Sequence, residues 1–248
     1  MDLGIAGRKA VVAAASQGLG FGAAKALAAE GVSVAICGRD RGRLNDALTR
    51  LGGTAVALVG DVSTSDGAAE FVTKATEALG GADILITNAG GPPPGNFTST
   101  ATDAYREALD LNLMSVVAMC KAAVPGMQAQ GWGRVVAITS ISVRQPQPHL
   151  ILSNTARAGA TAFLKTLATE VAADGVTVNS VQPGLHATDR LKQLYGGNLD
   201  AAVKGVPAQA LGSADDFGAV IAFLCSEQAK FVTGAALHVD GGAYPGLQ

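Results

Sequence analysis

The chain has 248 residues, enough for one or two domains, and its 48% hydrophobic against 15% charged residues provide material for a large buried core. This composition argues against a disordered or polar chain. The net charge is −2, from 18 basic and 20 acidic residues scattered along the sequence. We therefore expect neither a nucleic-acid surface nor a membrane surface.

The cysteines give no sign of a metal or redox site. Cys37, Cys120 and Cys225 are far apart and are predicted to be small buried hydrophobes. The chain does not open with a basic segment followed by an apolar one, and we find no apolar span of about 18 residues. We expect a reduced, cytoplasmic setting without a metal.

Seven short apolar runs, rich in valine, isoleucine and alanine, predict β-strands. They are continuous rather than alternating, which is typical of strands covered on both faces. Helical segments separate most of them, so the pattern predicts an α/β fold with a doubly wound parallel sheet and helices on both faces. The runs span residues 9–15, 32–37, 54–60, 83–88, 134–139, 176–181 and 235–240.

The alternation runs without a linker or internal repeat, and it predicts a single domain over residues 1–248. It is interrupted near residues 91–100, after the fourth strand, and over residues 184–213, after the sixth. Both segments follow the carboxyl ends of strands, where open α/β sheets bind ligands. We expect both to be substrate loops.

The first strand leads into a glycine-rich turn, AAASQGLGFG at 13–22, and then into a helix. Gly18 and Gly20 would let the backbone approach a phosphate, and the helix N-terminus would supply free N–H groups. A dinucleotide-binding turn is the favoured interpretation. A tight structural turn is the alternative.

The second strand ends in CGRD, where an acidic residue would bind the ribose 2′-hydroxyl of NAD. Gly38 takes that position and Arg39 follows, and the donors of an arginine suit a 2′-phosphate. NADP(H) is therefore favoured over NAD(H), unless Arg39 is an ordinary solvated charge. Arg41 and Arg43 are expected on the outer face of the next helix.

Two further strands end in polar residues. Asp61 follows the third strand and could accept a hydrogen bond from an adenine amino group. Asn88, Ala89 and Gly90 follow the fourth, and they would give a polar anchor and then space beside a cofactor. Each could equally be part of a simple turn.

Seven motifs in this order resemble those of the short-chain dehydrogenase/reductase family, and the match covers nearly the whole chain. In chain order they are the glycine-rich turn, DV (61–62), NAG (88–90), LNLMS with Asn112, RVVAITS with Ser140, NSVQPG (179–184) and VTGAALHVDGG (232–242). The resemblance implies a Rossmann fold, an NAD(P)(H)-dependent oxidoreductase, a small-molecule substrate and a homotetramer or homodimer.

The resemblance also assigns roles to single residues. Asn112 would position a water in a proton relay, and Ser140 would donate a hydrogen bond to the substrate carbonyl. Pro183 and Gly184 would flank the nicotinamide, and Thr188 would touch the pyrophosphate or the carboxamide. The full set of expected cofactor contacts is Ala14, Ser16, Gln17, Gly18, Leu19, Gly20, Arg39, Asp61, Val62, Asn88, Ala89, Gly90, Arg157, Pro183, Gly184 and Thr188.

The sequence departs from the family pattern at two places. Ala14 stands where the first glycine of the turn would be. Ser153 and Arg157 replace the catalytic Tyr-x-x-x-Lys, because Ser153 lies thirteen residues after Ser140 and Arg157 four residues later. Both are predicted on one face of a helix within residues 149–170, with Ser153 capping or entering it.

This replacement breaks the usual proton relay. A phenol has a pKa near 10, whereas an aliphatic hydroxyl is a much weaker acid, so Ser153 would only donate a hydrogen bond or hold a relay water. Arg157 would supply the charge and ribose hydrogen bonds of the lysine. With a pKa above roughly 12, it would not lend a proton.

Several other groups could replace the tyrosine. His149, His186 and Tyr195 are candidate acids, although each could simply pack in a loop. Alternatively, the substrate or water supplies the proton. A third hypothesis is that Arg157 and Arg144 bind an anionic group.

The leading hypothesis is an NADP(H)-dependent oxidoreductase that acts on a carbonyl or alcohol, with an altered catalytic site formed by Asn112, Ser140, Ser153 and Arg157. The nearest subclass is that of the 3-oxoacyl-carrier-protein reductases, although the fold does not determine the substrate. The alternatives are a cofactor-binding protein without redox turnover and a lyase or isomerase that uses Arg157 as an electrophilic clamp.

Overall fold

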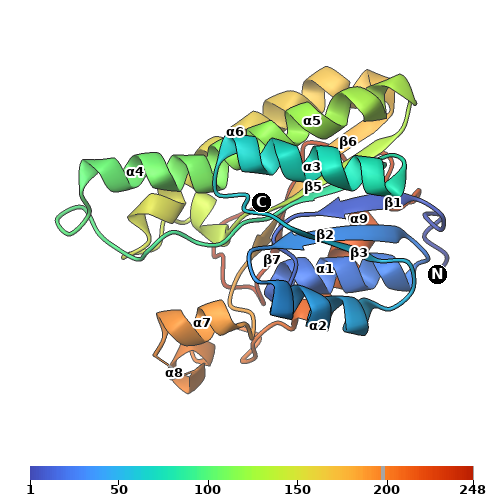
Figure 1. Cartoon of the computed structure of the whole chain (residues 1–248). Helices are drawn as coiled ribbons and strands as arrows, with labels where there is room; N and C mark the ends of the chain where they lie inside the picture. Colours follow the sequence, from blue (N-terminus) through green and yellow to red (C-terminus); the bar gives the residue numbers. More distant parts are fainter. Residues whose placement is uncertain (197–198, 248) are drawn as a thin grey trace.

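The computed structural model describes residues 1–196 and 199–247 of the chain. It contains one seven-stranded parallel sheet with the strand order β3-β2-β1-β4-β5-β6-β7 (Figure 1). All seven predicted strands are present, with bounds that differ by a few residues. They are β1 Lys9–Val12, β2 Ser33–Gly38, β3 Val56–Val59, β4 Ile84–Thr87, β5 Gly133–Ile138, β6 Val176–Pro183 and β7 Ala236–Val239.

Helices cover both faces of this sheet, as the alternating pattern predicts. Helices α1, α2 and α9 lie on one face, and α3, α5 and α6 lie on the other (Figure 1). The α-helices are α1 Gly18–Ala29, α2 Arg41–Leu51, α3 Ser65–Leu79, α4 Thr102–Leu109, α5 Ser115–Ala129, α6 Ile151–Val171, α7 Asp189–Leu194, α8 Leu199–Val203 and α9 Ala214–Leu224.

The continuous apolar runs reflect two hydrophobic cores, one on each side of the sheet. Successive residues of a strand point to opposite faces, so Ala10 and Val12 pack against α1 while Val11 packs on the other side. Both faces therefore require apolar residues. The thiols of Cys37, Cys120 and Cys225 are free and buried, as predicted.

Helices α4 and α5 join through a π-helical turn, Asp110–Met114, into one helical stretch, Thr102–Ala129. By length and composition this stretch could cross a membrane, with a mean hydropathy of 1.3 over its most apolar window, so the expectation of no such span was wrong. In this fold the apolar residues of this stretch pack in the hydrophobic core. Met119, Ala123 and Met127 are buried in the core beside α3 and the sheet, as expected of a core helix.

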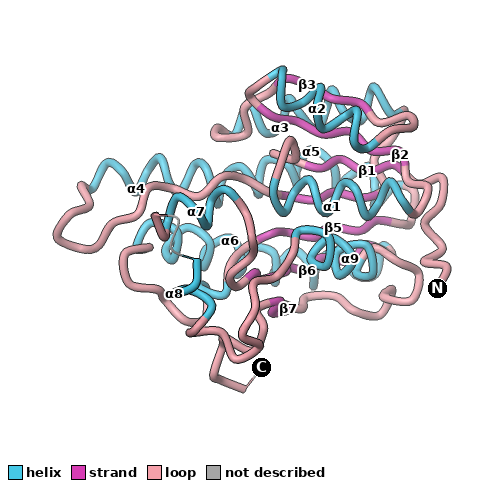
Figure 2. Tube along the Cα trace, turned by 90° about the horizontal axis from the view of Figure 1, so that it is seen from below, coloured by secondary structure: helices cyan, strands magenta, loops and turns pink. Residues whose placement is uncertain are grey.

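The strand order brings the expected ligand segments together. The chain passes from β1 outward to β2 and β3 and then returns to β4 on the other side of β1, so the turn after β1 faces the loop after β4. Helices α4, α7 and α8 extend from the carboxyl edge of the sheet, at the opposite end from the N-terminus (Figures 1 and 2). Any site built from these loops lies at that edge.

Candidate active site

The glycine-rich turn has an unusual backbone at Ala14. This residue adopts φ +47°, in the left-handed region that glycine occupies more easily. Its N–H donates to the thiol sulfur of Cys37 at 3.3 Å. Helix α1 then starts at Gly18 with φ +64°, and Gln17 provides no side-chain cap. The first N–H groups of α1 are therefore available to an anion such as a pyrophosphate.

The positive φ of Ala14 should cost the protein stability that a glycine would restore. Ala14→Gly should raise the free energy of unfolding by about 1 kcal/mol, because alanine pays that cost in the left-handed region. Urea denaturation of the two proteins at equal concentration measures it. Ala15→Gly is the control, because Ala15 is fully buried without a positive φ and should lose stability. A loss of stability in Ala14→Gly would contradict the interpretation.

Asn88 braces this turn from the end of β4. Its Nδ2 donates to the carbonyl oxygens of Ala13 at 3.3 Å and Ala14 at 3.1 Å. The amide N–H groups of Asn88 are therefore used within the protein. Gly20 makes room for this amide, because a Cβ there would lie 2.6 Å from Nδ2 of Asn88. The lack of a side chain at Gly20 therefore serves the contact with Asn88, and its close approach to a phosphate stays a prediction.

The predicted adenosine end lies where β1, β2 and β3 finish. A Cβ on Gly38 would lie 3.1 Å from Oγ of Ser16, so Ser16 lies close to this glycine, and the exposed Arg39 follows directly. Asp61 is also exposed, and its Oδ1 accepts the N–H of Ser63 at 3.0 Å. The exposed side chains of Arg39 and Asp61 can therefore still form hydrogen bonds with a ligand at this part of the carboxyl edge.

The other residues predicted to bind the cofactor lie at the same edge, and some of them also contact other parts of the protein. Gly184 approaches β7 closely, since a Cβ would lie 2.7 Å from Cβ of Asp240. Thr188 caps α7, accepting the N–H of Leu191, and its Cγ2 would lie 3.9 Å from a Cβ on Gly18. The others are Gln17, which is exposed, Gly90, which borders open space, Leu19, Ala89 and Pro183, which are partly buried, and Val62, which is buried.

Asn112 lies in the π-helical turn between α4 and α5, and it is 2% exposed. Its Nδ2 donates to the carbonyl oxygen of Gly90 at 3.0 Å. Its Oδ1 is buried and has no hydrogen-bond partner in the structure. A buried acceptor of this kind costs free energy unless a water or ligand fills it, which suits the predicted relay.

Ser140 follows β5 and begins a short 3₁₀ turn, Ile141–Val143. Its Oγ accepts the N–H of Ser142 at 3.1 Å. Because that bond uses a lone pair, the O–H hydrogen of Ser140 remains free to donate to a ligand. This arrangement fits the predicted role.

The helix that carries Ser153 and Arg157 begins two residues inside the predicted stretch, residues 149–170. Helix α6 begins at Ile151 after Leu150, so Ser153 enters the helix in its first turn and does not cap it, which is the second of the two predicted positions. His149 explains the start, because it takes φ +63° and its carbonyl oxygen accepts the N–H of Gly95 at 2.7 Å. The backbone before Leu150 is thus held outside a helix.

Arg157 reaches from α6 to the end of β5. Its Nη1 donates to the carbonyl oxygen of Ile138 at 3.0 Å. Burial, with a smaller contribution from the positive charge of Arg190, lowers the pKa of Arg157 to about 10. This corrects the expectation of a pKa above 12. The side chain still keeps its proton at neutral pH, so it acts there as a charge.

The sequence reasoning missed Arg190. Its Nη2 donates to the carbonyl oxygen of Pro92 at 2.7 Å, and its guanidinium lies beside Gly91. The two predicted substrate loops therefore meet through this side chain. The only signal was an arginine inside a predicted loop, two residues after Thr188, and nothing in the sequence showed what it would contact.

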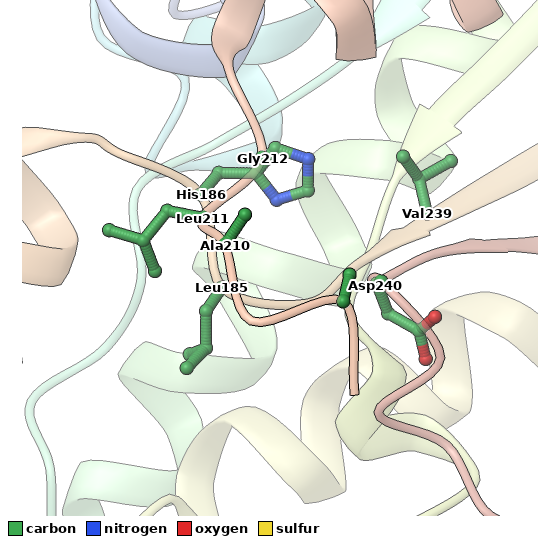
Figure 3. A pocket seen from close by; sticks show the side chains of 9 residues that line it. Leu185, His186, Ala210, Leu211, Gly212, Val239 and Asp240 are labelled. Atoms are coloured by element: carbon green, nitrogen blue, oxygen red, sulfur yellow. The ribbon is translucent and has the colours of Figure 1, made fainter. Parts of the chain in front are cut away.

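The three candidate acids differ in burial, since His186 is buried and the other two are exposed. His186 packs edge-on against Phe217, its Nδ1 lies 3.3 Å from the carbonyl oxygen of Gly184, and burial lowers its pKa. It lines a small cavity of about 140 Å³ (Figure 3). His149 and Tyr195 are exposed. Over residues 1–196 and 199–247, no hydrogen bond joins any of the three to Ser140 or Ser153.

Comparisons with known proteins agree with this architecture. A family model described as enoyl-(acyl carrier protein) reductase matches residues 13–244. The human dehydrogenase/reductase SDR family member 4 is 30% identical over 244 residues, covering 96% of this chain and 88% of that protein. The 3-oxoacyl-[acyl-carrier-protein] reductase FabG of Vibrio cholerae is 31% identical over 242 residues, covering 98% and 99%.

The fold also matches solved structures. The crystal structure of L-sorbose reductase from Gluconobacter frateurii, complexed with NADPH and L-sorbose, superposes with a TM-score of 0.93. The two chains are 32% identical, and the match covers 100% of each. The predicted Rossmann-type α/β fold is confirmed. The chain therefore belongs to the short-chain dehydrogenase/reductase family of oxidoreductases.

Proposed function

We propose that this protein is an NADP(H)-dependent oxidoreductase that interconverts a carbonyl and an alcohol on a small molecule, with an altered catalytic site. One observation carries the proposal. Asn112 keeps a buried oxygen without a partner, and Ser140 keeps a free hydroxyl hydrogen, at the edge where the dinucleotide turn lies. The expected relay thus retains two of its members, although Ser153 and Arg157 replace the other two.

The residues present fit a nicotinamide dinucleotide. The uncapped start of α1 would hold the pyrophosphate, together with Thr188 beside Gly18. Ser16 and Arg39 would hold the 2′-phosphate of NADP, and Asp61 would accept the adenine amino group. Solved relatives carry NADPH in one case and NADH in another, so the preference for NADP rests on Arg39. When bound, such a cofactor supplies or accepts the hydride.

The protein's own residues orient the substrate and handle the proton. Ser140 donates its hydroxyl hydrogen to the substrate oxygen. Arg157 stays protonated at neutral pH and would hold the ribose of the cofactor through its charge and N–H donors. Because a serine hydroxyl is a poor acid, Ser153 contributes a hydrogen bond. A water held at Oδ1 of Asn112 would pass a proton to the alcohol oxygen and regain one from solvent.

Calorimetric titration with NADPH and NADH tests the cofactor assignment. We expect NADPH to bind at least tenfold more tightly, and Arg39→Ala to remove most of that difference, because a charge-assisted contact to a phosphate is worth about 1.5–3 kcal/mol. Arg43→Ala is the control, since Arg43 is also exposed but lies on α2. Failure of both nucleotides to bind would overturn the proposal.

Turnover separates this function from its alternatives. NADPH oxidation with a panel of aldehydes and ketones supports the redox reaction. Binding of NADPH without oxidation would support a cofactor-binding protein, and substrate proton exchange without cofactor consumption would support a lyase or isomerase. A homotetramer or homodimer in the cytoplasm is also part of the proposal, and analytical ultracentrifugation measures the assembly.

A further inference from the structure

Two arginines at the carboxyl edge of the sheet lack an acidic partner. The described part of the chain contains five ion pairs, and neither Arg157 nor Arg190 takes part in one. Both side chains are partly buried. Arginines withdrawn from water are usually paired with an anion, because an unpaired buried charge is costly.

The two side chains come from different elements, and backbone carbonyls position both of them. Arg157 is on α6 and donates to the carbonyl oxygen of Ile138, two residues before Ser140. Arg190 is on α7 and donates to the carbonyl oxygen of Pro92. Each of these bonds uses one of the five N–H donors of a guanidinium, so donors remain on both for a ligand.

Arg190 is connected to the catalytic residues through the loop after β4. Its guanidinium lies beside Gly91, and the preceding Gly90 accepts the hydrogen bond from Asn112. On the other side, Arg157 is tied to the strand that leads to Ser140. The positive charge of Arg190 also contributes to lowering the pKa of Arg157. Asn112 and Ser140 therefore connect to the two arginines through short backbone segments.

We propose that Arg157 and Arg190 form an anion-binding clamp for a carboxylate of the substrate, so that the enzyme acts on oxo acids and the corresponding hydroxy acids. This inference rests on the proposed function, because it names the substrate class of the same site. The clamp would bind the carboxylate while Ser140 donates to the neighbouring carbonyl oxygen. Guanidinium groups suit this task because their paired N–H donors match the two oxygens of a carboxylate.

The cofactor is a second possible source of the anion. Thr188, two residues before Arg190, lies beside Gly18 of the dinucleotide turn, so a pyrophosphate would also be near. We favour the substrate because Pro92 and Gly91, which hold Arg190, belong to the loop after β4 and not to the dinucleotide turn. The experiment must distinguish the two sources.

Matched pairs of acids and esters test the clamp by calorimetry on the protein saturated with NADP⁺, where a ketone cannot be reduced. The probes are pyruvate with methyl pyruvate, and acetoacetate with methyl acetoacetate. We expect the acid of at least one pair to bind about 10- to 100-fold more tightly than its ester, the range of one or two charge-assisted contacts. Equal binding within both pairs would overturn the proposal.

Variants of α7 then assign the selectivity. Arg190→Leu should reduce the ratio of acid to ester binding to about one, and Arg190→Lys should recover part of it, because a charge remains without the planar fork. Lys192→Leu is the control, since Lys192 is an exposed cation on the same helix, 3.3 Å from Asp189. Selectivity that survives Arg190→Leu would overturn the clamp.

The remaining outcomes separate the clamp from the cofactor. Suppose that Arg190→Leu weakens NADP⁺ binding tenfold or more and leaves the ratio of acid to ester binding unchanged. The anion is then the pyrophosphate, and the substrate assignment is wrong. If the wild-type protein binds neither nucleotide, the proposed function fails, and the same acid and ester titrations on the protein alone still decide whether the clamp exists.

Discussion

Ser140→Ala should lower kcat/KM for a carbonyl substrate by about 100- to 1000-fold, the usual effect of removing one hydrogen-bond donor from developing negative charge. The reason lies in how Ser140 is held. Its Oγ accepts the N–H of Ser142, so its own hydrogen remains free to donate to a ligand. Because Ser153 is not an efficient acid, the hydrogen bond from Ser140 provides more of the stabilisation of the negative charge that develops on the substrate oxygen. Steady-state rates of NADPH oxidation measure the effect.

The control for this experiment lies two residues away. Ser142→Ala removes a buried hydroxyl that has no hydrogen-bond partner in the structure and leaves the backbone N–H in place. It should change kcat/KM by less than threefold, and both variants should bind NADPH as the wild type does. If Ser140→Ala keeps its activity within threefold, Ser140 is not the donor.

Gly22→Ala should lower the free energy of unfolding by about 3 kcal/mol, which is the upper end of the usual cost of overpacking. Helices α1 and α9 touch through their backbones at this point. A Cβ on Gly22 would collide with the carbonyl oxygen of Ala214, and a Cβ on Gly218 would collide with that of Gly22. Neither contact can be relieved by turning a side chain. Urea denaturation at a fixed protein concentration measures the loss.

Gly126→Ala is the matched control, and it should change the free energy of unfolding in the opposite direction. Gly126 is also inside a helix, α5, but a Cβ there would meet nothing within 4 Å. Alanine should therefore raise the free energy of unfolding by up to about 1 kcal/mol, from helix propensity alone. An equal loss in both variants would show that the effect at Gly22 is not one of close helix packing.

Local pattern was sufficient to predict the strands and the edge at which the site lies. Runs such as residues 9–15 are apolar on both faces because the sheet is covered on both, and this property is visible in a short stretch of sequence. The turns that follow such strands then had to meet at the carboxyl edge. Asn112 and Ser140 were predicted because their motifs resemble those of a known family.

The errors concern contacts between distant segments. Asn88 turns toward Ala14, Arg190 binds the carbonyl oxygen of Pro92, and Gly95 holds His149 in the conformation that delays α6. Each of these contacts depends on how two loops pack, and a linear pattern does not contain that information. The placement of Ser153 inside the helix follows from the last of them.

The buried thiols should protect the native protein from alkylating reagents. Burial raises the pKa of each of Cys37, Cys120 and Cys225 to about 12, so at neutral pH all three are protonated as well as inaccessible. Unfolding restores both access and ordinary acidity. Brief exposure to iodoacetamide thus marks each molecule that has opened. The three sites report on separate parts of the chain, because Cys37 lies in β2, Cys120 in α5 and Cys225 at the end of α9.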